Sequence, residues 1–303
     1  MHMKTCPNCW SQNSDYASYC EYCGHPLFKK CPNCGAKVKP SSKYCPDCGT
    51  AIGDDENSEE SKTFYVRGVS FKMIFVKGGT FMMGSSEDDE DTQPDERPRH
   101  KVTLSDFYIG EIRVSAALWK AVMGDIPLEY YEWTTYSGYT EYKNTYKPDF
   151  PVESSSFVES EDFIEELNRI TGEKFRFPTE AEWEYAARGG QKSRGYRYAG
   201  SNDYDAIGTC DWNPHPYKQK KPNELGIYDM CDTQWEWCSD YYDFDYYKSS
   251  PQFNPCNTEE SSKRVIRGGC DSKYCRRARP AYRGSDKEKA KGGLLSLRLA
   301  MSI

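Results

Sequence analysis

Residues 178–190 read Pro-Thr-Glu-Ala-Glu-Trp-Glu-Tyr-Ala-Ala-Arg-Gly-Gly, and this stretch decides the fold of the larger part of the chain. Thr179 and Glu182 have the spacing of a capping box, in which each side chain accepts a backbone N–H at the start of a helix. The acidic residues fall in the first turn and Arg188 falls in the last, so both charges suit the helix dipole. The stretch therefore predicts a short helix with both ends marked.

Short strands and a few further helices are predicted around that helix. Residues 73–84 hold two apolar runs separated by a Gly-Gly turn, which is typical of a β-hairpin. Residues 101–110 return to strand character. Ser156 opens a second capping box, and Ser115 can cap a short helix that Gly124 ends. We therefore predict an α+β domain.

A tyrosine-rich insert lies between residues 130 and 146. We expect it to form a loop folded over the core. The functional alternative is an aromatic rim around a ligand, because tyrosine offers a large contact area with only two side-chain torsions.

The composition limits the classes of function. The chain has 303 residues, 37% of them apolar, with a formal net charge of −7, which argues against broad nucleic-acid binding. No apolar run approaches the roughly 20 residues of a membrane helix, and the N-terminus lacks the apolar core of a signal peptide. Fourteen cysteines without an export signal indicate reduced thiols and bound metal, so we expect a cytoplasmic protein.

The first fifty residues contain two similar units of paired cysteines. Two residues between the thiolates of a pair let both reach one tetrahedral ion at about 2.3 Å. The predicted zinc ligands are Cys6, Cys9, Cys20 and Cys23 in the first unit, and Cys31, Cys34, Cys45 and Cys48 in the second. The segment resembles the double zinc ribbon family. Both sites would be closed and structural, and zinc would provide most of the folding energy of so small a piece.

The chain thus divides into three predicted parts. Residues 1–52 form the double zinc ribbon, residues 53–63 form an acidic flexible linker, and residues 64–303 form the larger domain. The ribbon segment is mildly basic, and we expect it to bind a protein partner rather than nucleic acid.

Several motifs of the larger domain are similar to the formylglycine-generating enzyme family. They are Gly-Gly-Thr-Phe-Met-Met-Gly at 78–84, Asp-Glu-Arg-Pro-Arg-His at 95–100, the stretch at 178–190, and Trp235-Glu-Trp237. The family is also called the sulfatase-modifying factor domain and is built on a variant of the C-type lectin fold. The resemblance therefore implies a C-type-lectin-like domain of short strands with a few helices.

The C-terminal part carries the enzyme interpretation of that resemblance. In active family members two cysteines five positions apart bind copper(I) and activate oxygen, which converts a cysteine of a substrate protein to formylglycine. Cys270-Asp-Ser-Lys-Tyr-Cys275 has this spacing, so the resemblance implies Cys270 and Cys275 as catalytic candidates with Cu⁺ as cofactor.

Departures from the family pattern favour a different interpretation. Three residues are missing between Gly268-Gly269 and Cys275, and the closing Gly-Phe-Arg appears as Ser296-Leu-Arg298. We therefore favour a non-catalytic recognition domain that binds a ligand or peptide at its C-terminal surface, where arginines could hold acidic groups. The candidate ligand-binding residues are Arg277, Arg279, Arg283, Tyr282 and Trp235. A third interpretation is a retroelement-diversified lectin-fold binding protein, because such proteins display their variable positions in this part of the chain.

Calcium is a further cofactor that the resemblance suggests. The family binds calcium through an Asn and a Glu around Trp-Glu-Trp, whereas this chain has Asp232-Thr233-Gln234 before Trp235. Asp232, Thr233 and Glu236 could still supply the oxygen ligands that calcium prefers.

Elemental analysis of the purified protein checks the zinc prediction. We expect about two zinc ions per chain, one for each set of four thiolates. One ion, or none, would contradict the prediction for the ribbon segment.

Overall fold

The computed structural model describes residues 3–6, 11–14, 17, 19–22, 27–31, 33–38, 42, 44–50, 60–127, 130–136, 139–209, 215–269, 278–292 and 294–303. Its strands are β1 (Met3–Thr5), β2 (Gln12–Ser14), β3 (Lys29–Lys30), β4 (Lys37–Val38), β5 (Ser61–Val66), β6 (Val69–Val76), β7 (Gly79–Met83), β8 (His100–Leu104), β9 (Phe107–Gly110), β10 (Tyr130–Tyr136), β11 (Tyr139–Thr145), β12 (Phe175–Arg176), β13 (Trp235–Tyr241), β14 (Arg264–Arg267), β15 (Gly284–Asp286), β16 (Leu295–Ser296) and β17 (Ala300–Ser302). The α-helices are α1 (Ala116–Met123), α2 (Phe157–Thr171) and α3 (Glu180–Ala187). Short 3₁₀ turns lie at Pro94–Glu96, Gly190–Lys192, Tyr204–Ala206 and Tyr246–Lys248.

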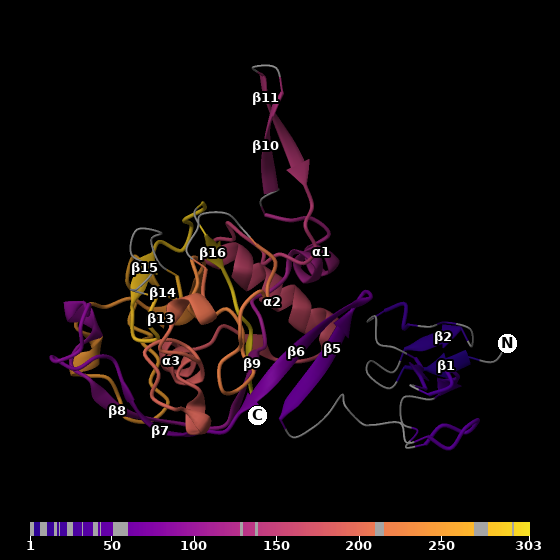
Figure 1. Ribbon diagram of the computed structural model, residues 1–303, viewed down its shortest axis with the longest axis horizontal. Helices are drawn as coiled ribbons and strands as arrows, with labels where there is room; N and C mark the ends of the chain where they lie inside the picture. The colour runs from indigo at the N-terminus through magenta and orange to yellow at the C-terminus, as the bar shows by residue number, and fades with distance from the viewer. Residues whose placement is uncertain are drawn as a thin grey trace.

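Two sheets organise the larger domain (Figure 1). The first has five strands in the order β12-β17-β9-β6-β5, and the second has four strands in the order β15-β14-β13-β16. Strand β17, close to the C-terminus, pairs with β9 through Ala300↔Ile109 and with β12 through Met301↔Phe175. All four residues of β9 are buried, which suits a strand near the middle of a covered sheet.

The helices begin and end where the sequence predicts. Ser156 and Thr179 each accept a backbone N–H three residues later within a complete capping box, at the start of α2 and α3. Ser115 caps α1, and Gly124 ends it. All eight residues of α3 are buried, although three of them are glutamates. These caps are local chemistry, which explains why the sequence alone places them.

Two aromatic clusters fill the core. In one, Trp119 of α1 stacks on Phe163 of α2 with ring centroids 4.7 Å apart. In the other, Trp183 of α3 is fully buried among side chains of the β7–β8 ribbon and the second sheet. Among the residues described, no helix is long and apolar enough to cross a membrane.

Two segments differ from the sequence predictions. Residues 61–63, predicted as linker, belong to β5, which pairs with β6 from Ser61↔Ile74 onward. The tyrosine-rich insert forms the hairpin β10–β11, in register from Tyr130↔Thr145 to Tyr136↔Tyr139, and not a loop over the core. It projects from the domain (Figure 1). Its aromatic and β-branched residues have high strand propensity, which explains the difference.

A glycine pair at the end of β14 directs the chain between two tryptophans. Gly268 has a positive φ of 83°, and a Cβ there would lie 2.7 Å from Cζ2 of Trp183. A Cβ on Gly269 would lie 2.4 Å from the ring of Trp235. Only glycine leaves room for this close approach, so the pair sets where the C-terminal part begins.

Gly268→Ala should therefore be costly. Left-handed backbone and overpacking against Trp183 together should lower the free energy of unfolding by about 2–4 kcal/mol. Gly172→Ala is the matched control, because Gly172 also has a positive φ, of 74°, but a Cβ added there would meet nothing within 4 Å. Gly172→Ala should lower the free energy of unfolding by about 1 kcal/mol. Urea unfolding measures both, and equal losses would contradict the packing argument.

Candidate functional site: zinc ribbons and a cavity at the C-terminal segment

The second ribbon unit brings its four predicted ligands together. One sulfur from each of Cys31, Cys34, Cys45 and Cys48 lies within 4.8 Å of the others. The sulfurs of Cys31 and Cys48 are 3.5 Å apart, and those of Cys34 and Cys45 are 3.6 Å apart. A tetrahedral ion with Zn–S bonds of about 2.3 Å would hold sulfurs about 3.8 Å apart. The arrangement therefore fits a structural zinc ion.

Both cysteine pairs of this unit make the same turn. The N–H of Gly35 donates to the carbonyl of Cys31, and the N–H of Gly49 donates to the carbonyl of Cys45, each at 2.9 Å. In the first unit Cys6 and Cys20 are buried, while Cys9 and Cys23 lie outside the described residues. The Nδ2 of Asn13 donates to the sulfur of Cys20 at 3.4 Å, as expected for a thiolate ligand.

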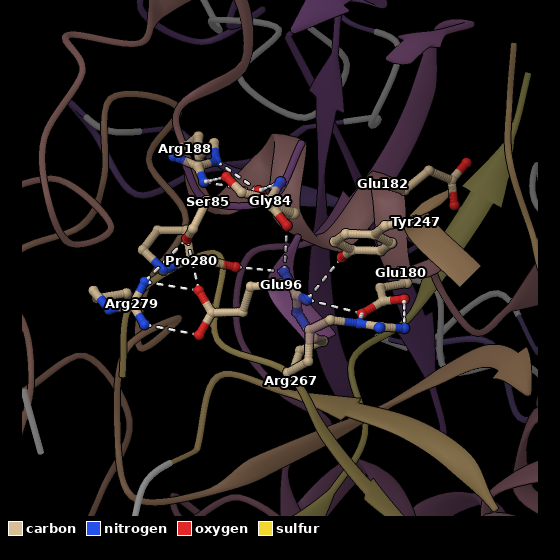
Figure 2. A network of polar contacts seen from close by, with 12 residues as sticks. Gly84, Ser85, Glu96, Glu180, Glu182, Arg188, Tyr247, Arg267, Arg279 and Pro280 are labelled. Atoms are coloured by element: carbon tan, nitrogen blue, oxygen red, sulfur yellow. Dashed lines mark hydrogen bonds and ion pairs between the residues drawn. The ribbon is translucent and has the colours of Figure 1, made fainter. Parts of the chain in front are cut away.

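A buried network of ion pairs holds residues 278–292, called the C-terminal segment below, in place (Figure 2). Glu180 of α3 accepts from Nη1 of Arg267 at 2.8 Å and from Nε and Nη2 of Arg283 at 2.7 and 2.9 Å. Glu184 accepts from Nη2 of Arg267 at 2.6 Å and from Nε of Arg188 at 2.8 Å. Burial raises the pKa of Glu184, but the guanidinium groups of Arg188 and Arg267 outweigh this and keep it below its usual value. Both carboxylates are buried, and each faces two arginines that offset the cost of burying its charge.

Arg279 is held in the same way from another direction. Its Nη1 and Nη2 donate to the two carboxylate oxygens of Glu96 at 3.0 and 2.8 Å, and the hydroxyl of Ser85 also donates to Glu96, at 2.6 Å. Such a two-pronged pair is both strong and directional. Arg279 is therefore tied to a segment that precedes it by more than 180 residues.

The expectation of a solvent-facing arginine surface needs correction. Arg279 is only 6% exposed and Arg283 only 4%, because buried carboxylates of Glu96 and Glu180 require cationic partners. Trp235 and Tyr282 are half-buried and lie together, with ring centroids 5.7 Å apart. Cys270, Cys275 and Arg277 lie outside the described residues, so their predicted roles stay predictions.

Two of the three residues proposed for calcium, Asp232 and Glu236, have their carboxylates paired with arginines. Asp232 accepts from Nη2 of Arg113 at 2.7 Å, and Glu236 accepts from Nε and Nη2 of Arg298 at 2.8 and 2.7 Å. Burial raises the pKa of Asp232, but the Arg113 guanidinium and His215 outweigh this and hold it well below its usual range. Buried Thr233 donates its N–H to Asp232. Guanidinium groups thus supply positive charge beside the two carboxylates, and calcium binding by the three residues stays a prediction.

An open cavity of about 420 Å³ lies beside Arg279. The loop after β7 forms one wall, residues 195–202 form a second, and the C-terminal segment forms a third. The lining residues are Gly84, Ser85, Asp89, Glu90, Arg99, Arg188, Gly195, Tyr196, Arg197, Asn202, Arg279, Pro280 and Ala281.

Sequence reasoning did not find most of this cavity. It singled out Arg279, but Arg99, Arg188 and Arg197 come from three other places in the chain. Arg99 and Arg188 lie within motifs that the sequence assigns to the scaffold. No spacing in the sequence shows that these side chains meet.

The fold and the cysteine site together define a class: a zinc-ribbon protein with a C-type-lectin-like α+β domain. Residues 60–303 match the family model described as the sulfatase-modifying factor enzyme 1-like domain, and residues 6–49 match the double zinc ribbon. The chain belongs to the sulfatase-modifying factor enzyme 1-like family.

Similar proteins carry varied names. Chaperone protein LppX of Paenibacillus barcinonensis is 32% identical over 240 residues, which cover 66% of this chain and 79% of that protein. The formylglycine-generating enzyme of Streptomyces coelicolor is 37% identical over 144 residues, which cover 41% of this chain and 46% of that enzyme. Among solved structures, Treponema denticola variable protein 1 aligns with a TM-score of 0.65 and 25% identity, covering 80% of this chain and 98% of that one.

The buried ion pairs predict that removing the single charge of Glu180 lowers the free energy of unfolding strongly. Glu180→Gln removes the carboxylate that Arg267 and Arg283 share, and loss of one partner from a buried pair should lower the free energy of unfolding by about 3–5 kcal/mol. Glu166→Gln is the control, since Glu166 pairs with Arg169 on an exposed face of α2 and should change it little. Urea unfolding followed by circular dichroism compares the two, and a small effect of Glu180→Gln would refute the structural role of the network.

Proposed function

We propose that the protein is a non-catalytic recognition protein that acts in the cytoplasm. Its zinc ribbons bind a protein partner, and its sulfatase-modifying-factor-like domain binds a ligand in the cavity beside Arg279. The observation that carries the proposal is this cavity of about 420 Å³, which is open and lies within the roughly 300–1,000 Å³ typical of small-molecule sites. Part of its wall is formed by Arg279, Pro280 and Ala281, in the segment that the sequence singled out.

The state of the arginines supports recognition over oxidation. A positive charge beside a thiol favours the reactive thiolate only if nothing else neutralises it. Arg279 is paired with Glu96 and Arg283 with Glu180, so both charges are already balanced. These two arginines hold the segment in place and leave little field for a nearby cysteine.

The names of the relatives indicate that this fold occurs with different activities. Proteins that share the domain are named as a formylglycine-generating enzyme, a chaperone and a serine/threonine-protein kinase. A fold that occurs with such different names does not determine the chemistry, which depends on the residues of each site.

The copper-dependent oxidase is the second candidate. It is favoured by the spacing of Cys270 and Cys275 and by the 37% identity to a formylglycine-generating enzyme. Under that alternative the two thiols would hold copper(I), which would supply the activation of molecular oxygen, the oxidant that converts a cysteine of a substrate protein to formylglycine.

One assay separates the two candidates. The full chain is incubated aerobically with copper(I) and a Cys-x-Pro-x-Arg peptide, while oxygen uptake and the mass of the peptide are followed. We expect no formylglycine, because the C-terminal part of the chain departs from the enzyme pattern. The Streptomyces coelicolor enzyme serves as the positive control. Turnover that disappears in Cys270→Ser or Cys275→Ser would overturn the recognition proposal in favour of the oxidase.

A further inference from the structure

The cavity beside Arg279 is lined by four arginines. Arg99, Arg188, Arg197 and Arg279 face it against only two acidic side chains, those of Asp89 and Glu90. A concave site with one dominant sign of charge concentrates counter-ions of the opposite sign. Arg188, Arg197 and Arg279 are paired with Glu184, Asp91 and Glu96, so Arg99 supplies most of the positive charge that is left to attract an anion.

The arginines differ in how far the protein already satisfies them. Arg188 donates to Glu184 and to the carbonyl of Gly84, and Nη2 of Arg197 donates to Asp91 at 2.8 Å. Arg99 is exposed, and no hydrogen bond or ion pair is found for it within the described part of the chain. Nη1 of Arg197 lies 3.8 Å from Glu90, which is longer than a hydrogen bond, so Arg99 and this nitrogen keep donors for a ligand.

A buried donor without an acceptor is a second, independent observation. The Nε of Arg279 is buried and has no hydrogen-bond acceptor among the residues described, and the same holds for Nε of Arg197. Arg279 is itself more than nine-tenths buried. Leaving such a group unpaired costs about 1–3 kcal/mol, and native proteins rarely tolerate it. Neither nitrogen is in contact with solvent, so an acceptor in the cavity can reach it only if the guanidinium turns toward the cavity when a ligand binds.

The remaining wall suggests what else the ligand carries. Exposed Asn202 can form hydrogen bonds, whereas Tyr196, Pro280 and Ala281 offer apolar contact. Figure 2 shows Ser85, Arg188, Arg279 and Pro280 together on the side of Glu96 away from Glu180. An inorganic anion would leave most of the roughly 420 Å³ empty.

We propose that this cavity binds a small organic anion, with its carboxylate or phosphate group between Arg99 and Arg197, beside the Arg279–Glu96 pair. Arginine suits both groups, because its planar fork matches their paired oxygens. The inference rests on the proposed recognition function, since it names the ligand class of the same cavity.

Three probes of similar size test the inference on the full chain with zinc bound. Phenyl phosphate and benzoate carry the two anionic groups on an aromatic ring, and benzyl alcohol is the neutral match. Isothermal titration calorimetry should show binding of at least one anion and none of the alcohol. Tighter binding of phenyl phosphate assigns a phosphorylated ligand, and tighter binding of benzoate assigns a carboxylate. Binding of neither anion with a Kd below about 10 mM would overturn the inference.

Variants locate the binding. Arg99→Ala should weaken the preferred anion about tenfold or more, and it should fold normally because Arg99 is exposed. Arg197→Ala should act in the same direction. Arg169→Ala removes the same charge from an exposed position on α2, outside the cavity, and should leave the affinity unchanged. An affinity that Arg99→Ala and Arg197→Ala leave unchanged would place the anion elsewhere and refute the site.

The anion inference and the proposed function can be rejected independently of each other. Anion affinity is measured without copper or peptide, so its absence would reject the ligand class and leave the recognition proposal standing. Copper-dependent turnover would reject the recognition proposal whatever the anion affinity.

Discussion

The structure depends on glutamates that are buried inside a helix. Helix α3 places Glu180 and Glu184 in the core, where an ionised carboxylate is stable only beside a cation. Glu180 binds Arg267 and Arg283, and so joins β14 to the C-terminal segment. Glu184 binds Arg267 on one oxygen, and on the other it accepts from Arg188 and from the N–H of Gly84 at the cavity wall. The same pairs that stabilise the fold therefore also position the cavity.

The sequence predicted the features that are set by neighbours along the chain. The capping boxes at Ser156 and Thr179, the cysteine pairs of the second ribbon unit and the two families all follow from short spacings, and the structure and comparisons confirm them. It did not predict the partners of Arg279 and Arg283. Glu96 and Glu180 lie more than 100 residues away from them, and only the packed sheets bring them together. An arginine at the surface and one in a buried pair look the same in a sequence, which explains why Arg279 and Arg283, expected at the surface, are buried.

The residues that line the cavity could not be predicted from the sequence either. Its arginines come from four separate segments of the chain, and only the tertiary structure brings them to one cavity. Arg188 suits the helix dipole, as the sequence indicates, yet it also lines the cavity. One side chain can thus serve the fold and a site at once, and sequence periodicity reports only the first role.

Strand β17 has a consequence for biosynthesis. It lies between β9 and β12, so the five-stranded sheet is complete only when residues 300–302 have paired with both strands. Its partner Ile109 leaves the ribosome almost 200 residues earlier, and β9 must wait with one edge unpaired until then. The ribbon segment, whose contacts are local and whose zinc sites need no later residue, can fold long before. During most of their synthesis, nascent chains of this protein should therefore have a folded ribbon segment and an unpaired edge on β9. An unpaired strand edge is prone to aggregation, so this is the state in which a chaperone is most useful.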